Sequence, residues 1–285
     1  MSASPSEPGP DAPAFLDARA VLRRHGLRPD HRLGQNFLID PAALERVVQA
    51  AELDPQDTVL EIGAGIGTLT SRLARSAGRV VAVEIDRRLI EPLLEGVRPF
   101  PGVQVVHADA LQLDLTALMR GEPFRVVANI PYQITSHLLR RLMEMPQGPD
   151  RVVLTLQAEV VDRITAQAGE MSLLALSVQV YGLARRAAHI PAGAFFPAPE
   201  VDSAVLRIDR HPRPAIAPEQ IPAFFRVARA GFQQRRKQLH NALSAGLGLG
   251  AAEVAGLLAR AAVRPDVRAQ ELTLADWERI ARQMD

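Results

Sequence analysis

Short apolar runs alternate along the chain with segments of helical periodicity. The apolar runs lie near residues 58–62, 79–84, 103–107, 126–129, 151–156, 184–190 and 204–208. Runs of this length, bounded by turns, are typical of buried strands. Helices are expected near 41–51, 68–76, 136–145, 158–167 and 172–181. Strands that alternate with helices predict an α/β fold built on a doubly wound sheet.

The pattern changes after the last predicted strand. His211-Pro212-Arg213-Pro214 has the composition of a linker, and helical periodicity follows from Ile221 to the C-terminus. The 285 residues are therefore divided into a domain at 14–210 and a small all-helical domain at 211–285. Residues 1–13 are rich in Pro, Ser, Ala and Gly, without the order of a signal peptide, and are expected to form a disordered tail.

Polar residues and glycines follow the ends of the first three predicted strands of the sheet. Gly63-Ala64-Gly65-Ile66-Gly67 follows the first strand, Glu84 ends the second, and Asp109 comes just after the third. The carboxyl ends of parallel strands meet at a ligand-binding edge, where glycines allow close approach and an acid can hold a ribose. Asp109 can likewise accept a hydrogen bond from an adenine amine, although a capping role for either acid also fits the sequence.

The fourth strand ends at Asn129-Ile130-Pro131-Tyr132. An amide, a proline-stiffened carbonyl and an aromatic ring in succession make a poor nucleophile but a suitable holder for a flat ring that carries an amine. The alternative is a strand-ending turn with a surface tyrosine.

The composition excludes several kinds of functional site. There is no cysteine, and the seven histidines are scattered without metal-ligand spacing, so no metal site is expected. No apolar run approaches the ~20 residues of a membrane helix, and a cytoplasmic protein without a membrane partner is expected. The net charge is only +1, but five arginines lie between Arg19 and Arg32, and five basic residues lie between Gln220 and Asn241.

A G-x-G-x-G loop, preceded by Glu61 and followed by acids after two strands, favours an S-adenosylmethionine site over a dinucleotide site, which uses G-x-G-x-x-G. With the N-I-P-Y sequence, the chain resembles the small-subunit ribosomal RNA adenine dimethyltransferase family (KsgA/RsmA type). The resemblance extends over residues 31 to 280. Further matching segments are Gly34-Gln35-Asn36-Phe37-Leu38, Phe195-Phe196-Pro197-Ala198-Pro199-Glu200-Val201-Asp202-Ser203 and Phe232-Gln233-Gln234-Arg235-Arg236-Lys237-Gln238-Leu239.

The resemblance implies a Rossmann-like methyltransferase domain with S-adenosylmethionine as cofactor, and it implies roles for individual residues. The implied cofactor-binding residues are Gln35, Asn36, Leu38, Gly63, Gly65, Glu84, Asp109 and Asn129. Asn129, Pro131 and Tyr132 would hold the target adenine, and Phe195 would stack on it. Arg235, Arg236 and Lys237 would contact RNA phosphates from a basic helix.

The substrate implied by the resemblance is a pair of adjacent adenosines near the 3′ end of 16S rRNA, within the immature small ribosomal subunit. A monomeric enzyme is expected. Two alternatives are an adenine methyltransferase that acts on 23S rRNA and a non-catalytic factor of ribosome assembly.

Overall fold

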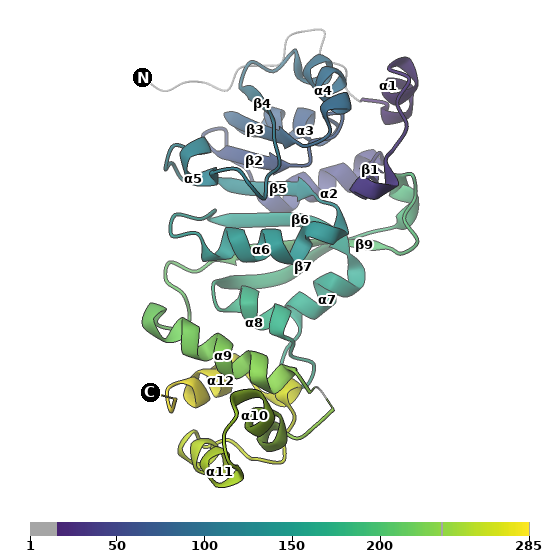
Figure 1. Ribbon diagram of the computed structural model, residues 1–285. Helices are drawn as coiled ribbons and strands as arrows, with labels where there is room; N and C mark the ends of the chain where they lie inside the picture. Colours follow the sequence, from purple (N-terminus) through teal and green to yellow (C-terminus); the bar gives the residue numbers. More distant parts are fainter. Residues whose placement is uncertain (1–15, 235, 285) are drawn as a thin grey trace. The chain divides into compact units, whose positions relative to one another are not determined.

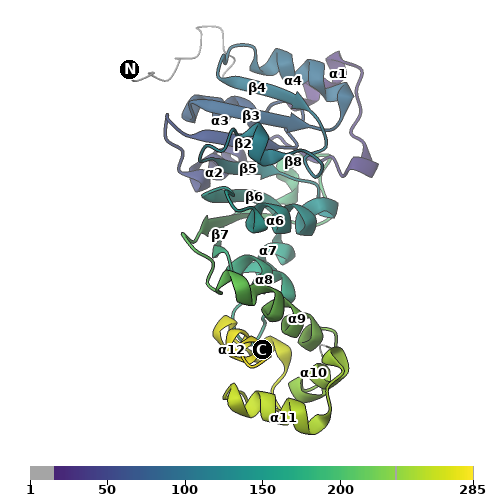
Figure 2. The same cartoon turned by 60° about the vertical axis from the view of Figure 1, so that its left-hand side comes forward.

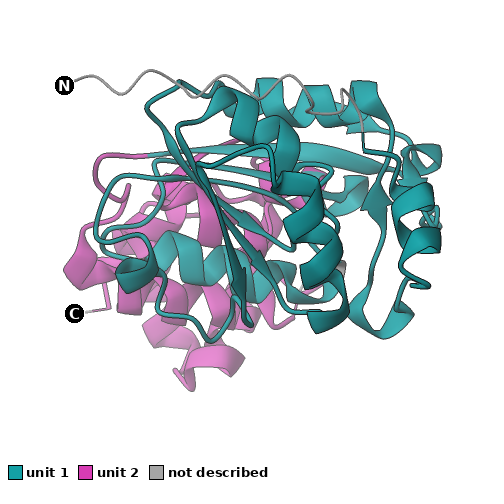
Figure 3. Ribbon diagram, turned by 90° about the horizontal axis from the view of Figure 1, so that it is seen from above, with its two compact units in different colours: residues 1–161, 185–210 teal, residues 162–184, 211–285 magenta. Residues whose placement is uncertain are grey.

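The computed structural model describes residues 16–234 and 236–284 of the chain, so the tail expected at 1–13 and the predicted RNA contact Arg235 lie outside the described residues. The chain divides into two compact units (Figure 3). Unit 1 comprises Met1–Val161 and Arg185–Arg210, and unit 2 comprises Asp162–Ala184 and His211–Asp285.

Unit 1 contains a seven-stranded sheet with the strand order β4-β3-β2-β5-β6-β9-β7 (Figure 1). The pairs β4–β3, β3–β2, β2–β5 and β5–β6 are parallel, and β9 is antiparallel to β6. This arrangement confirms the predicted doubly wound sheet. The strands are β2 (Thr58–Ile62), β3 (Arg79–Glu84), β4 (Val103–His107), β5 (Arg125–Asn129), β6 (Arg151–Gln157), β7 (Gly182–Ile190) and β9 (Ser203–Arg210).

Helices cover both faces of the sheet. Figures 1 and 2 show α6 on one side and α2 on the other. The helices of the sequence up to β7 are α1 (Ala18–Arg24), α2 (Pro41–Ala51), α3 (Thr70–Ser76), α4 (Ile90–Val97), α5 (Leu115–Leu118), α6 (Thr135–Glu144), α7 (Ala158–Thr165) and α8 (Leu173–Gln179).

Helix α2 begins where the sequence predicts. The Asp40 side chain accepts a hydrogen bond from the Ala43 N–H at 2.7 Å, and Pro41 occupies the first helical turn. The buried face of the helix, which includes Leu44 and Val47, packs on alternate residues of the central strands: Val59, Val127, Val153 and Val205. Burial of these side chains fixes one face of the sheet against α2.

A two-stranded ribbon that the sequence pattern did not predict joins two distant segments of unit 1. Strand β1 (Phe37–Leu38) pairs antiparallel with β8 (Phe195–Phe196), so that Phe37 lies opposite Phe196 and Leu38 lies opposite Phe195. Phe195 is 2% exposed and belongs to the core with Leu38 and α2. This corrects the expectation of an exposed stacking ring at Phe195, because its pairing with Leu38 turns the side chain into the apolar interior.

Unit 2 contains α8 and the helices α9 (Ile221–Phe232), α10 (Leu239–Leu247), α11 (Ala251–Arg260) and α12 (Leu274–Ala281). Trp277 is fully buried and packs on Phe232, with ring centroids 5.4 Å apart. A Cβ on Gly231 would approach the Trp277 ring to 2.4 Å, so only glycine admits this contact.

The expected domain boundary after residue 210 coincides with a division between the units, whereas residues 162–184, expected in the first domain, belong to unit 2. This segment groups with unit 2 because its backbone is bonded there. The N–H groups of Gly169 and Met171 both donate to the Gln270 carbonyl, and the Ala215 N–H donates to the Val180 carbonyl.

Within the described residues, no single helix is long and apolar enough to cross a membrane. The pair α10 and α11, bent by 118°, reaches the length and hydropathy of a span only when taken together.

Candidate functional site

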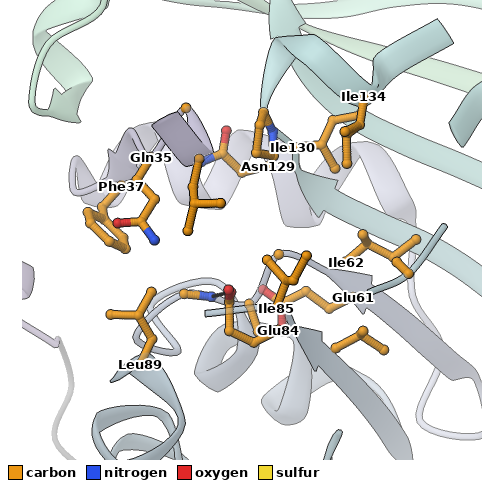
Figure 4. Close-up of a pocket in the computed structure, with 18 of the residues that line it drawn as sticks. Gln35, Phe37, Glu61, Ile62, Glu84, Ile85, Leu89, Asn129, Ile130 and Ile134 are labelled. Atoms are coloured by element: carbon orange, nitrogen blue, oxygen red, sulfur yellow. Dashed lines mark hydrogen bonds between the residues drawn. The ribbon is translucent and has the colours of Figure 1, made fainter. Parts of the chain in front are cut away.

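The pocket opens at the carboxyl ends of β2, β3 and β5, beside the segment that leads into β1 (Figure 4). Five stretches of unit 1 line it, within the ranges 32–38, 61–69, 83–89, 108–110 and 129–134. This is the edge at which parallel α/β sheets bind ligands. It brings together the predicted cofactor residues Gln35, Asn36, Leu38, Gly63, Gly65, Glu84, Asp109 and Asn129.

The glycine loop after β2 has a left-handed backbone conformation that residues with a side chain rarely adopt. Gly63 and Gly65 have φ values of +75° and +60°, and a Cβ on Gly65 would lie 3.1 Å from the Phe37 ring. The N–H groups of Gly63 and Ala64 donate to the Val83 carbonyl at 2.8 and 3.2 Å. These bonds hold the loop against β3, where Gly63, Ala64 and Gly65 line the pocket.

Glu84, at the end of β3, braces this loop. Its carboxylate accepts hydrogen bonds from the N–H groups of Gly65 (2.7 Å) and Asp86 (2.8 Å), and the residue is 5% exposed. Burial raises the pKa of the Glu84 carboxyl, and the two N–H donors oppose that rise. A carboxylate has about four acceptor positions, so Glu84 can accept further hydrogen bonds from a ligand. Figure 4 shows it facing the pocket across from Asn129.

Glu61 is a site residue whose role is not predictable from the sequence pattern. It lines the pocket, is 1% exposed, and its Oε2 atom has no hydrogen-bond partner among the described residues. Burial, with the nearby charge of Glu84 adding to it, raises the pKa of the Glu61 carboxyl to about 8. The group is therefore mainly neutral at pH 7. The feature of the sequence that could have identified Glu61 is that it is the one acid within the apolar strand β2.

Gln35 holds the segment before β1 in place. Its Oε1 accepts a hydrogen bond from the Asp30 N–H, and its Nε2 donates to Asp86 Oδ2, each at 2.8 Å. Hydrogen bonds to Asp86 from the Arg88 guanidinium and, to a smaller extent, from the Gln35 amide hold the pKa of the Asp86 carboxyl below its usual range. Since both polar ends of the Gln35 amide are engaged, the structure gives Gln35 a positioning role at the pocket wall.

Asn129 has one end of its amide fixed. Its Nδ2 donates to the Asn36 carbonyl at 2.9 Å, which directs the Oδ1 oxygen elsewhere as an acceptor. The Pro131 carbonyl accepts the Ile134 N–H at 3.3 Å and starts a short 3-10 turn, Tyr132–Ile134. Pro131 lines the pocket, whereas the Tyr132 side chain lies outside the described residues.

Asp109 lies in the pocket wall and also caps the turn that follows β4. Its two oxygens accept hydrogen bonds from the Leu111 N–H and from Gln112 Nε2, both at 2.9 Å. The capping alternative for Asp109 is thus realised, and its carboxylate retains acceptor positions for a ligand.

The remaining predicted contacts are not among the residues that line this pocket. Arg236 and Lys237 are exposed in unit 2, in the turn between α9 and α10 and not on a helix as expected. Phe195 is absent from the pocket lining, as its place in the core requires.

Similarity to known proteins decides the family. A family model described as ribosomal RNA adenine dimethylase matches residues 27–285. The chain belongs to the ribosomal RNA adenine dimethylase family. The expected enzyme class, an adenine methyltransferase that uses S-adenosylmethionine, is thereby confirmed.

Relatives of this dimethylase chain cover nearly its whole length. A protein of Dehalococcoides mccartyi named ribosomal RNA small subunit methyltransferase A is 41% identical over 266 residues, which is 93% of this chain and 91% of that protein. A protein of the same name from Streptococcus pneumoniae serotype 2 is 41% identical over 274 residues, covering 92% and 94% of the two chains.

Solved structures agree in fold. The 23S rRNA methyltransferase ErmE has a TM-score of 0.71 and 28% identity, covering 88% of this chain and all of that one. A dimethyladenosine transferase from Plasmodium falciparum has a TM-score of 0.73 at 23% identity, covering 86% and 95%.

Proposed function

We propose that this dimethylase transfers methyl groups from S-adenosylmethionine to the exocyclic amines of two adjacent adenosines near the 3′ end of 16S rRNA, within the immature small ribosomal subunit. The relatives named small subunit methyltransferase A, 41% identical over more than nine tenths of the chain, support this choice of RNA. We further propose that the enzyme acts as a cytoplasmic monomer.

The observation that carries the chemistry is the orientation of the Asn129 amide. Because Nδ2 is held by the Asn36 carbonyl, Oδ1 is the end of the amide that remains for a ligand. The same pocket contains Glu84 and Asp109, whose carboxylates are acceptors. A pocket lined by acceptors suits ligand groups that carry N–H and O–H bonds, such as a ribose and an adenine amine.

The residues present fit an adenosyl cofactor. Gly63 and Gly65 remove Cβ atoms where a ligand approaches the loop, and Glu84 offers free acceptor positions to the two ribose hydroxyls. Asp109 would accept the adenine amine of the cofactor, and the partnerless Glu61 Oε2 marks a polar position that a ligand or water can satisfy. When bound, S-adenosylmethionine supplies an electrophilic methyl group.

Asn129 would raise the reactivity of a weak nucleophile. The lone pair of an adenine amine is delocalised into the ring, which keeps the nitrogen planar. Acceptance of its N–H bonds by Asn129 Oδ1 and by the Ile130 carbonyl would favour a pyramidal nitrogen with an exposed lone pair. The Pro131 carbonyl is already engaged by the Ile134 N–H, which makes the Ile130 carbonyl the better second acceptor. Fixed acceptor dipoles and proximity then lower the barrier.

In unit 2, we propose that the exposed turn with Arg236 and Lys237, adjoining Arg235, contacts rRNA phosphates. Replacement of these basic residues by Ala should flatten the salt dependence of RNA binding.

The test is transfer of labelled methyl groups from S-adenosylmethionine to small subunits that lack the modification, with mapping of the modified bases. The expected result is two methyl groups on each of two adjacent adenosines near the 3′ end of 16S rRNA. Label confined to other bases, or no transfer, would overturn the proposed function.

A second candidate substrate, an adenine of 23S rRNA, is favoured by the likeness to ErmE. The assay distinguishes the two candidates when large-subunit RNA is offered in parallel. The stronger identity to proteins named for the small subunit makes 23S rRNA the weaker choice.

A further inference from the structure

A basic groove lies beside the pocket in unit 1. It has a volume of about 640 Å³ and lies between α1, the segment after it and β8. Three arginines, Arg19, Arg23 and Arg28, line it together with Phe196, and no acid contributes to its lining among the described residues. The lining is completed by Leu22, Gly26, Leu27 and Pro29.

Helix α1 turns its charged side outward because its apolar side is anchored. Ala18, Val21 and Leu22 are buried and pack with Phe37, Ile66 and Leu89. Arg19 and Arg23 are exposed and four residues apart, which places two like charges one turn apart on the helix surface. Such a pair destabilises an isolated helix, and no acid in the described groove lining compensates for it. The two arginines therefore do not serve the stability of the helix.

The arginines off the groove provide the contrast. Arg24, on the same helix, pairs with Glu95 at 2.7 Å, and Arg32 pairs with Asp30 at 3.5 Å. Over residues 16–234 and 236–284, no ion pair is formed by Arg19, Arg23 or Arg28. The chain thus neutralises its neighbouring arginines and leaves the three groove arginines available to an anionic partner.

One of these arginines is held by an aromatic ring. The Arg19 guanidinium lies 5.1 Å from the centroid of the Phe196 ring, within the range of a cation–π contact. This contact reduces the mobility of a long side chain before a ligand arrives. Its planar fork suits bidentate hydrogen bonding to a phosphate.

The ribbon connects the groove with the pocket. Phe196 pairs with Phe37, and Phe37 lines the pocket. Neighbouring strands lie about 5 Å apart, so the groove begins one strand away from the pocket wall. An RNA strand that delivers a base to Asn129 would have its neighbouring phosphates close to this groove.

We infer that Arg19, Arg23 and Arg28 form a second RNA-binding surface, which holds the phosphates of the strand that carries the target adenosine. This inference rests on the proposed function. It assigns the path of the substrate strand to unit 1, independently of the basic turn in unit 2. The groove positions the substrate and takes no part in methyl transfer.

The test compares the full chain with a variant that carries Arg19→Gln, Arg23→Gln and Arg28→Gln, which keeps most of each side-chain stem. We expect the slope of log Kd for 16S rRNA against log salt to fall by about 2, at roughly 0.7 per lost phosphate contact with single-stranded RNA. KM for immature small subunits should rise about tenfold or more, with kcat and S-adenosylmethionine affinity unchanged. The matched control is Arg24→Gln, on the same helix but paired with Glu95, which should leave the slope unchanged.

A triple Lys variant at the same positions should retain most of the slope, because it keeps the charge. If the triple Gln variant fails to fold, each single Gln variant should still reduce the slope by about 0.7. A wild-type slope and KM in the Gln variants would overturn the inference while leaving the proposed function intact. A loss seen with assembled subunits but not with free 16S rRNA would also overturn it, in favour of a ribosomal protein. Failure of the wild-type chain to methylate small-subunit RNA would overturn the proposed function itself.

Discussion

The two edges of the sheet in unit 1 differ in how their buried ionisable side chains are paired. At the carboxyl edge, Glu61 and Glu84 are almost fully buried and no cation pairs with them among the described residues. At the opposite edge, Arg207 is 5% exposed and is paired with both Glu52 (2.5 Å) and Asp209 (2.8 Å).

Arginine side chains at the opposite edge also donate hydrogen bonds to the free carbonyls at the C-terminal end of α2. Three arginines from adjacent strands, Arg125, Arg151 and Arg207, donate to backbone carbonyls at the C-terminal end of α2, at residues 50 and 51 of the helix and at its C-cap, residue 52. Cationic groups at a helix C-terminus are stabilising. One edge therefore uses ion pairs to hold the fold together. The other buries acids without a cation partner among the described residues, and burial raises the pKa of both Glu61 and Glu84.

The largest expected effect concerns Phe195, which the family resemblance places at the pocket and the structure places in the core. Phe195→Ala should lower the free energy of unfolding by about 4 kcal/mol, as for other buried aromatic truncations. Urea denaturation measures this change. Phe195→Leu, which keeps an apolar side chain, should cost less than ~1.5 kcal/mol and leave the ratio of monomethyl to dimethyl product unchanged. Accumulation of the monomethyl product in the Leu variant would restore the stacking role.

Next in size is the removal of Glu84 from the pocket edge. Glu84→Ala should raise the dissociation constant for S-adenosylmethionine about 100-fold, since each hydrogen bond to a charged acceptor is worth ~1.5–3 kcal/mol. Calorimetric titration measures the affinity. Replacement of the exposed Glu91 by Ala serves as the control and should have no effect. An unchanged affinity in the Glu84 variant would remove this acid from the site.

At the opposite edge, Arg207→Ala should lower the free energy of unfolding by about 2 kcal/mol. The substitution removes an ion pair with Asp209 and a hydrogen bond to the Ala50 carbonyl. The partial exposure of Glu52 and Asp209 keeps the effect below that of a fully buried pair. S-adenosylmethionine affinity, measured below the unfolding temperature, should not change. Arg140→Ala breaks the exposed pair with Glu144 and should cost under ~0.5 kcal/mol.

The smallest effect is a pH dependence from Glu61. Between its ordinary pKa of 4.5 and about 8, the folded chain retains a proton that the unfolded chain has lost, so stability falls as pH rises across this window. Relative to Glu61→Gln, the wild type should lose about 1–2 kcal/mol between pH 6.5 and pH 8, where one pH unit is worth at most ~1.4 kcal/mol. Parallel pH profiles of the two proteins would contradict a buried, protonated Glu61.

The sequence predicts the strands well because each apolar run is local and bounded by turns. The predicted runs at 58–62, 79–84 and 103–107 match β2, β3 and β4 in their bounds. The ribbon β1–β8 could not be predicted in this way, because two-residue strands lack periodicity and their pairing joins residues more than 150 positions apart.

For the site, the residues after strand ends were the predictable part. Glu84, Asp109 and Asn129 reach one pocket because parallel strands end together. The burial of Phe195 depends on its tertiary partner Leu38, and the raised pKa of Glu61 depends on burial from several elements. Neither property is encoded in the neighbouring residues.

Activation of the adenine amine by Asn129 is tested by single-turnover methyl transfer with the Asn129→Ala variant on immature small subunits, with S-adenosylmethionine affinity measured in parallel. If Asn129 Oδ1 activates the adenine amine, the rate should fall by roughly 100-fold or more, as for other lost transition-state hydrogen bonds, while the affinity changes little. A near-normal rate with unchanged affinity would contradict this role of Asn129.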